Sequence, residues 1–272
     1  MLTDYGLKAV FFVEPLFSTC FGPEPLHEII DLLSSSEREI QLHLHTEWVD
    51  ESKTPLLPNI REKRQHLRYF TLEEQTTLIN KGLSLLRAAG VNSINAFRAG
   101  SFGFNCETLL ALAANGITYD SSYNASYFGL DSGVMPGVPI YAPIEYEQIQ
   151  EYPMTVFKDG FGKLRHTQIS ACSFSEIEST LWRALESGYT SVIILSHNFE
   201  LLNQAKDRPD WITIRRLEKL CQFLDKNKDC FTARGFQDLT PQVSTVQPRL
   251  LTVPRWATVG RLVEQLYRRR YQ

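Results

Sequence analysis

Residues 39–45 read Glu-Ile-Gln-Leu-His-Leu-His, an alternation of polar and apolar side chains that is typical of a half-buried β-strand. Successive side chains of a strand point to opposite faces, so the three aliphatic residues share one face while His43 and His45 share the other. Two imidazoles that point the same way can converge on one divalent metal ion. The segment therefore predicts a strand with a core face and a metal site, with His43 and His45 as ligands.

Two alternatives to this ligand pair follow from the same residues. Glu47 lies four residues after His43 and offers a carboxylate oxygen in place of His45. An isolated His-x-His pattern is also compatible with two ordinary polar residues at the rim of a sheet.

The rest of the chain alternates between strand and helix patterns. We expect strands at residues 8–13, 39–45, 93–98, 117–120, 151–157, 191–197 and 231–234, and helices at residues 25–34, 71–89, 105–115, 173–187, 213–227 and 258–269. Capping-box patterns at residues 71–74 and 173–176 mark two of the helix starts. This alternation predicts an α/β fold, a parallel sheet with helices outside it, either open or closed into a barrel. The polar connector 50–69 is long enough to be a functional loop.

Two regions are expected: a barrel-like domain over residues 1–240, and a linker with a basic amphipathic helix over residues 241–272. Basic residues gather there at Arg261 and Arg268–Arg270. This pattern is typical of a solvated tail and, as the alternative, of a patch for an anionic partner or a membrane.

Composition narrows the class of protein. The chain has 272 residues, 43% of them hydrophobic and 22% charged, with a net charge of −3, which argues against a nucleic-acid binder. Its five cysteines include no C-x-x-C pair, as expected of free thiols in a reducing compartment. The first residues have neither a signal-peptide pattern nor a membrane span, so we expect a soluble, cytoplasmic protein.

Polar residues follow three further expected strands. In parallel α/β folds, chemistry gathers at the carboxyl ends of the strands. Arg98 leads into a glycine-bearing loop, Asp120 precedes two serines, and His197 follows a strongly apolar run. His197 is placed for general acid or base chemistry. Each residue also has a structural alternative: an Arg paired with a carboxylate, a turn Asp and a satisfied His.

The order and spacing of these segments resemble the NodB-type polysaccharide deacetylases over residues 5–240. The resemblance rests on residues 39–45, on Phe97-Arg98-Ala-Gly-Ser-Phe-Gly103, on Asp120-Ser-Ser and on Leu195-Ser-His197. In the usual family pattern the second metal His lies four residues after the first, where this chain has Glu47. The His-Leu-His-x-x-Trp form resembles a bacterial subgroup associated with surface-polysaccharide gene clusters.

The resemblance implies a distorted (β/α) barrel and a metal-dependent hydrolase that removes acetyl groups from an N-acetylated sugar or polysaccharide precursor. It implies a divalent ion, zinc in our expectation, on His43 and His45, with His197 as the acid, Arg98 fixing a carboxylate base and Asp120 in the site. The partner is a carbohydrate.

One part of the family pattern has no counterpart in the chain. The family's first strand, which carries an acidic base and an acidic metal ligand, is expected upstream of Lys8, where only Met1–Gly6 stand. A non-catalytic glycan-binding or scaffold relic of the same barrel is therefore the alternative function. A different metal hydrolase is a second alternative, with His166 and His197 as its late ligands.

Overall fold

The computed structural model describes residues 1–58, 63–130, 134–135, 137–203 and 205–271. Its larger sheet has six strands in the order β1-β2-β3-β4-β6-β5. These strands are β1 (Val10–Val13), β2 (Glu39–Leu44), β3 (Ala96–Ala99), β4 (Tyr119–Asp120), β5 (Ile144–Tyr146) and β6 (Ile149–Glu151). All neighbouring pairs are parallel except β5 with β6. The α/β class is thus confirmed.

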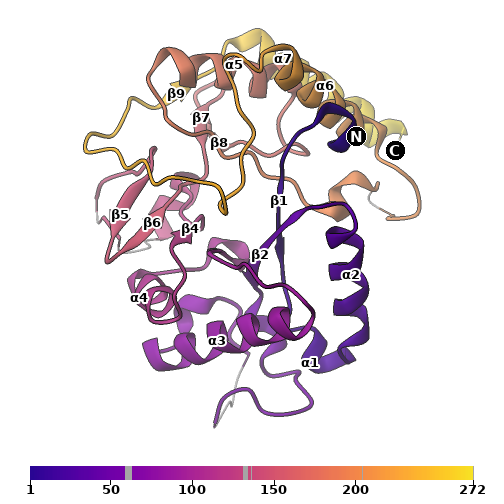
Figure 1. Cartoon of the computed structure of the whole chain (residues 1–272). Coiled ribbons are helices and arrows are strands. Elements are labelled where there is room, and N and C mark those ends of the chain that lie inside the picture. Colours follow the sequence, from indigo (N-terminus) through magenta and orange to yellow (C-terminus); the bar gives the residue numbers. More distant parts are fainter. Residues whose placement is uncertain (59–62, 131–133, 136, 204, 272) are drawn as a thin grey trace.

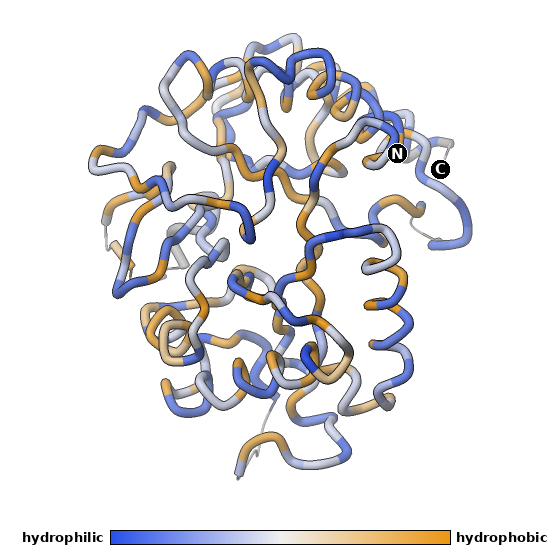
Figure 2. The backbone as a smooth tube through the Cα atoms, viewed as in Figure 1, coloured by the Kyte–Doolittle hydropathy of each residue, from blue (hydrophilic) through white to orange (hydrophobic). Residues whose placement is uncertain are grey.

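Helices cover the outer face of this sheet (Figure 1). They are α1 (Ser18–Phe21), α2 (Glu24–Ser34), α3 (Leu72–Ala88) and α4 (Cys106–Ala114). The start of α3 is fixed by a capping box, in which Thr71 Oγ1 accepts from Glu74 N and the Glu74 carboxylate accepts from Thr71 N. Asn105 caps α4 in the same way. Polar and hydrophobic residues alternate along α2 (Figure 2). Leu26 and Ile30 of this helix are buried, and the helix contacts β2.

The strand β2 has the two faces that its sequence predicts. Leu42 and Leu44 are fully buried and lie against Gly82 of α3, where an added Cβ would be 2.8 Å from a Leu44 methyl group. Gly82 thus allows helix and strand to approach closely. The opposite face of β2 carries Gln41 and His43, which bond to Asn95 and to the carbonyl group of Arg98. Because Leu42 and Leu44 pack against α3, the imidazole of His43 points to the opposite face of the sheet.

A second layer lies beyond β6. It has a three-stranded sheet in the order β8-β7-β9 and three helices (Figure 1). These elements are β7 (Val156–Lys158), β8 (Leu164–His166), β9 (Leu251–Thr252), α5 (Phe174–Glu186), α6 (Trp211–Lys226) and α7 (Arg255–Tyr271). Since β9 pairs with β7 and α7 packs on α5, residues beyond 240 contact the rest of the fold. The domain boundary at residue 240 stays a prediction.

Short 3-10 helices complete the secondary structure. They lie at Thr3–Tyr5, Thr46–Trp48, Leu67–Tyr69, Gly100–Phe102, Ala125–Leu130 and Asn198–Leu201. Of the long connector 50–69, residues 59–62 fall outside the described part of the chain. No helix among the described residues is long and apolar enough to cross a membrane.

Backbone hydrogen bonds extend the sheet around an inner cluster. Thr167 N bonds to Thr155 O at 2.9 Å, and Leu195 N bonds to Thr167 O at 2.9 Å. The cluster inside contains Phe12, Tyr119, Tyr152, Ile193 and Phe236. Among the described residues, no backbone pairing joins β1 to the segment around Leu195. The curved sheet is therefore open there, and a closed barrel is not seen.

Three expected strands differ from the structure. The segment 151–157 is not one strand, since residue 151 ends β6 and residues 156–157 begin β7 in the other sheet. Residues 191–197 form one bridge, between Leu195 and Gln168, and residues 231–234 have no strand. The apolar composition of residues 191–197 fits a strand, but a strand needs a continuous ladder of backbone hydrogen bonds, and in the described chain this segment bonds to its neighbour only around Leu195.

Candidate active site at the strand ends

Polar side chains collect at the carboxyl ends of the parallel strands. His43 of β2 lies opposite Arg98 of β3 in the register, so both point to the same side of the sheet. Asp120 ends β4, one strand further along. The fold therefore brings three of the residues predicted from the sequence to one edge.

His43 is half-buried, and its imidazole is neutral. Burial, with smaller effects from His45 and Arg98, lowers its pKa to about 3. Its Nδ1 atom donates to the carbonyl oxygen of Arg98 at 2.6 Å. Because Nδ1 carries the hydrogen, the Nε2 atom keeps its lone pair, the form in which imidazole binds metals.

His45 lies beside His43, with ring centroids 4.7 Å apart and planes at 83°. Its Nδ1 atom is 2.9 Å from a carboxylate oxygen of Glu47. This contact fixes the ring orientation and engages Nδ1, so that Nε2 is the ring nitrogen left for a further partner. Glu47, the rival ligand of the sequence analysis, thus contacts the imidazole that it would replace.

Glu14 is a site residue that the sequence analysis missed. It directly follows β1, and its carboxylate accepts from Leu16 N at 2.8 Å and Phe17 N at 3.0 Å. Burial raises its pKa to about 8, with a further contribution from the charge of Glu47. The rule that polar residues at strand ends mark the site would have found it.

Arg98 is held by the next strand. Its Nε atom donates to Ser121 O at 3.0 Å, an Nη atom donates to Ser121 Oγ at 2.9 Å, and its guanidinium lies 4.4 Å from the Phe12 ring centroid. Burial lowers the pKa of Arg98 to about 10. The negative charges of Asp120 and Glu151 act in the opposite direction and raise it. Among the ion pairs of the described chain, none joins Arg98 to a carboxylate within 4 Å.

Asp120 forms a buried acidic pair with Glu151, its register partner on β6. Both side chains are fully buried, and burial raises the pKa of each, that of Glu151 well above its usual value because Asp120 is beside it. Asp120 accepts from Ser122 Oγ at 2.6 Å, and Ser122 Oγ accepts from Ala99 N at 2.8 Å. In this arrangement the fully buried Asp120 holds the ends of β3 and β4 together through Ser122.

His197 has a carboxylate partner that the sequence analysis did not assign. Its Nδ1 atom lies 3.1 Å from Glu200 Oε1, and its backbone N donates to Glu200 Oε2 at 3.2 Å. Burial opposes the ionisation of Glu200, but the hydrogen bonds from His197 and Ser170 lower its pKa overall. The ring stacks on Phe199 and its side chain is 40% exposed. The charge of His197 is the smallest of the effects that shift the pKa of His43 downward.

The loop after β3, residues 100–103, has a strained backbone and lies beside the candidate site. Ser101 and Phe102 have φ values of 53° and 57°, in the left-handed region. A Cβ on Gly100 would lie 2.6 Å from Leu44 O and 3.0 Å from the His45 ring. A Cβ on Gly103 would lie 2.5 Å from His66 Nδ1. The two glycines therefore allow the backbone of this loop to lie against the rings of His45 and His66.

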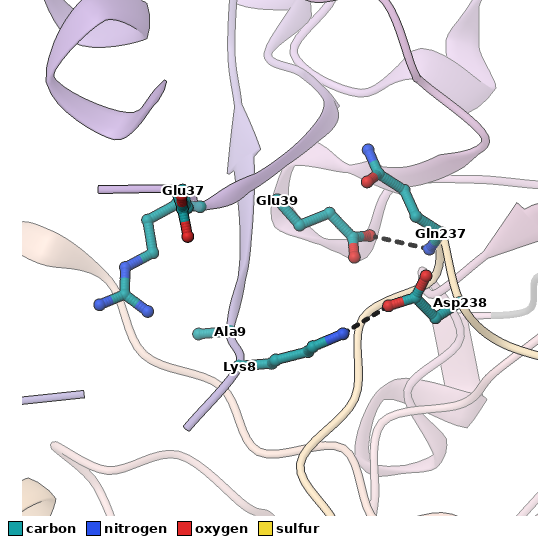
Figure 3. Close-up of a pocket in the computed structure, with 7 residues that line it drawn as sticks. Lys8, Ala9, Glu37, Glu39, Gln237 and Asp238 are labelled. Atoms are coloured by element: carbon teal, nitrogen blue, oxygen red, sulfur yellow. Dashed lines mark hydrogen bonds and ion pairs between the residues drawn. The ribbon is translucent and has the colours of Figure 1, made fainter. Parts of the chain in front are cut away.

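The cavity in Figure 3 lies at the opposite end of the strands. It has a volume of about 330 Å³ and is lined by Lys8, Ala9, Glu37, Arg38, Glu39, Gln237 and Asp238. An ion pair joins Lys8 to Asp238, and Gln237 N donates to Glu39. None of the predicted site residues lines it.

The donor set fits part of a metal centre. His43 and His45 offer two Nε2 atoms on one side of β2, each with its Nδ1 atom engaged. Within the described residues, no group of three or more His, Cys, Asp or Glu side chains is arranged to bind a metal ion. A third protein ligand is thus missing from this part of the chain.

Comparison with known proteins gives distant structural likenesses. No family model matches the sequence, and no curated protein matches it. A structure from Mycobacterium smegmatis, named a polysaccharide deacetylase, has a TM-score of 0.49 at 16% identity and covers 92% of this chain and 79% of that one. A family 4 carbohydrate esterase from Streptomyces lividans, in complex with acetate, has a TM-score of 0.46 at 12% identity, covering 92% and 87%.

A third likeness is to a 4-alpha-glucanotransferase from Thermococcus litoralis. Its TM-score is 0.36 at 14% identity, covering 96% of this chain and 46% of that one. Likenesses as distant as these three transfer no activity to the chain.

Proposed function

We propose that this chain is a metal-dependent hydrolase that removes acetyl groups from an N-acetylated sugar or polysaccharide precursor. The observation that carries the proposal is the pair of imidazoles on the inner face of β2. Both have Nδ1 engaged, by Arg98 O and by Glu47, so both Nε2 atoms are in the coordinating form. The sequence resemblance to NodB-type deacetylases supplies the reaction class.

In this proposal His43 and His45 hold a divalent ion, zinc in our expectation. Such an ion polarises an acetyl carbonyl group and lowers the pKa of a water molecule. Imidazole nitrogens are good ligands for zinc. Glu47 orients His45 without binding the ion.

His197 donates a proton to the leaving amine. Its Nδ1 atom faces Glu200, so the opposite ring nitrogen is directed away from that carboxylate. Glu200 fixes the ring orientation and stabilises the imidazolium. Arg98 and Asp120 act as positioning residues: Arg98 through its carbonyl oxygen on His43 and Asp120 through Ser122.

The outer edge of β1 is a position where a further strand could pair and supply the acidic residues that the resemblance implies. β1 pairs with β2 alone among the described strands, and Val10, Phe11 and Phe12 are only half-buried. Across the opening, residues 192–194 are also half-buried. We infer that a further strand pairs with β1 here and carries the base and third ligand that the resemblance implies, which would make the barrel complete. Glu14, already at the end of β1, is the rival source of the acid.

The alternative function is a glycan-binding or scaffold protein without catalysis. It is favoured by one observation, the absence of a three-ligand group in the described residues. Phe102, Tyr127 and His166, whose ring centroids lie 5.7 to 6.2 Å apart, would then form a surface for a sugar ring.

Acetate release from N-acetylglucosamine oligomers, measured with zinc-loaded protein, separates the two functions. The hydrolase releases acetate, and His197→Ala lowers turnover by a factor on the order of 100 or more while the ion stays bound. Binding of the oligomers with no acetate release, both for this chain and for one extended by a strand before β1, would leave the glycan-binding function.

A further inference from the structure

Helix α7 packs on the domain through its charged side. Arg261 is buried and donates to Asp159 Oδ2 and Glu176 Oε1, each at 3.0 Å. Glu264, the single acidic residue of the helix, lies 2.7 Å from the buried Arg216. Arg268 pairs with Asp210, the N-cap of α6. Arg261, Glu264 and Arg268 therefore face the protein.

The outer side of α7 is apolar along the length of the helix. Side chains spaced three or four residues apart share one face of a helix. The exposed face comprises Trp256, Val259, Leu262, Val263, Leu266 and Tyr267. Trp256 is 63% exposed, Val263 60% and Leu266 67%. We call these six residues the apolar face of α7.

This arrangement is the reverse of an ordinary surface helix, which buries its apolar stripe and exposes its charges. Buried ion pairs gain little stability over apolar packing, but removing one partner is costly, so they fix the orientation of the helix. The Arg261 contacts with Asp159 and Glu176 thus specify which side of α7 faces outward. A contiguous apolar surface on a helix marks an interaction site.

We propose that the apolar face of α7 docks onto an anionic lipid surface, with the helix lying in the plane of the membrane. Exposed Arg255 and Arg270 stand at its two ends, and Glu264 is turned toward Arg216. Apolar residues with Trp and Tyr, flanked by arginines, are the composition that binds at the headgroup level of anionic membranes. Trp256 and Tyr267 lie near opposite ends of the face, where both rings can reach the headgroups at once.

The positive charges at the two ends of α7 disfavour the docking of a second copy of the chain onto the apolar face of α7. Antiparallel pairing of two α7 helices would bring Arg255 of one copy to Arg270 of the other, and parallel pairing would bring like residues together. No acidic side chain of α7 is available to offset this repulsion, since Glu264 contacts Arg216. Anionic headgroups match the two arginines directly.

Co-sedimentation of the full chain with lipid vesicles tests the proposal. One set of vesicles is phosphatidylcholine alone, and the other contains roughly one third phosphatidylglycerol. We expect binding to the anionic vesicles, weakened by high salt. Val263→Ser with Leu266→Ser should lower the partition coefficient about tenfold or more, and Trp256→Ser with Val259→Ser should do the same independently. The matched control is Leu32→Ser on α2, where an equally exposed apolar side chain (70%) lies outside the face.

Three outcomes would overturn the proposal. The first is equal sedimentation with and without anionic vesicles. The second is binding that Leu32→Ser lowers as much as both double variants do. The third is a dimer in analytical ultracentrifugation that the two double variants dissociate while vesicle binding is absent, which would assign the face to a second copy.

Discussion

The imidazole Nδ1 of His43 lies 2.6 Å from the carbonyl oxygen of Arg98, its register partner on the neighbouring strand. This contact links two motifs 55 residues apart in the sequence. It sets the tautomer of His43 and leaves Nε2 directed to the inner side of the sheet. The backbone of β3, and not only the Arg98 side chain, therefore prepares the candidate metal ligand.

Glu47 should strengthen metal binding without being a ligand. Glu47→Ala removes the acceptor of His45 Nδ1, and we expect the zinc affinity to fall about 10- to 100-fold. Isothermal titration calorimetry measures this, with Glu51→Ala, an exposed neighbour paired with Lys63, as the control. If Glu47→Ala abolished binding while His45→Ala left it intact, Glu47 would be the ligand in place of His45.

The buried pair of Asp120 and Glu151 should make stability depend on pH. Below a pH of about 4.5, the pKa of Glu151 in the unfolded chain, Glu151 is protonated in both the folded and the unfolded chain. Its ionisation then makes no difference to the free energy of unfolding. As the pH rises above that value, the unfolded chain releases its proton while the folded chain retains it, so the free energy of unfolding falls until the raised folded pKa is passed. Glu151→Gln removes this cost.

Urea unfolding at pH 4 and pH 7.5 checks this expectation. The wild type should lose stability relative to Glu151→Gln over that interval, whereas the exposed control Glu218→Gln should follow the wild type. If the free energy of unfolding changed with pH in the same way for the wild type and Glu151→Gln, the ionisation of Glu151 would not destabilise the folded chain.

Gly100 should be required for the geometry of the site. An alanine Cβ at this position would meet Leu44 O at 2.6 Å, and we expect Gly100→Ala to cost about 1–3 kcal/mol of stability. Gly260→Ala is the matched control, since a Cβ there meets nothing within 4 Å, and it should be neutral or stabilise α7 by up to about 1 kcal/mol. Chemical denaturation measures both; equal stabilities would contradict the close approach.

Arg261 should anchor α7. Arg261→Gln leaves Asp159 and Glu176 without their buried cation, and we expect a loss of about 3–5 kcal/mol. Arg255→Gln, at an exposed position of the same helix, should change stability by less than about 0.5 kcal/mol. A loss for Arg261→Gln as small as that of the control would mean that the ion pairs do not fix the helix.

Local patterns predicted the helices well. The capping residues Thr71 and Ser173 start α3 and α5 as expected, because a cap depends on residues three positions apart. Strand pairing depends on distant segments, and this is why residues 191–197 read as a strand but make only one bridge. The closure of the sheet could not be read from composition for the same reason.

The shared position of three candidate residues was predicted, and their roles stay predictions. His43, Arg98 and Asp120 meet at one edge because parallel strands align their carboxyl ends. The partners were not predictable in the same way: Glu200 reaches His197 through a single turn of 3-10 helix, and Glu14 owes its raised pKa to burial that appears only in the folded chain.

Zinc content after equilibrium dialysis tests the central claim, that the imidazoles of His43 and His45 form the metal-binding pair. We expect the wild-type chain to bind zinc, His43→Ala and His45→Ala to lose it, and His197→Ala to retain it. Equal zinc content in the wild type and His43→Ala, or equal loss in His43→Ala and His197→Ala, would contradict it.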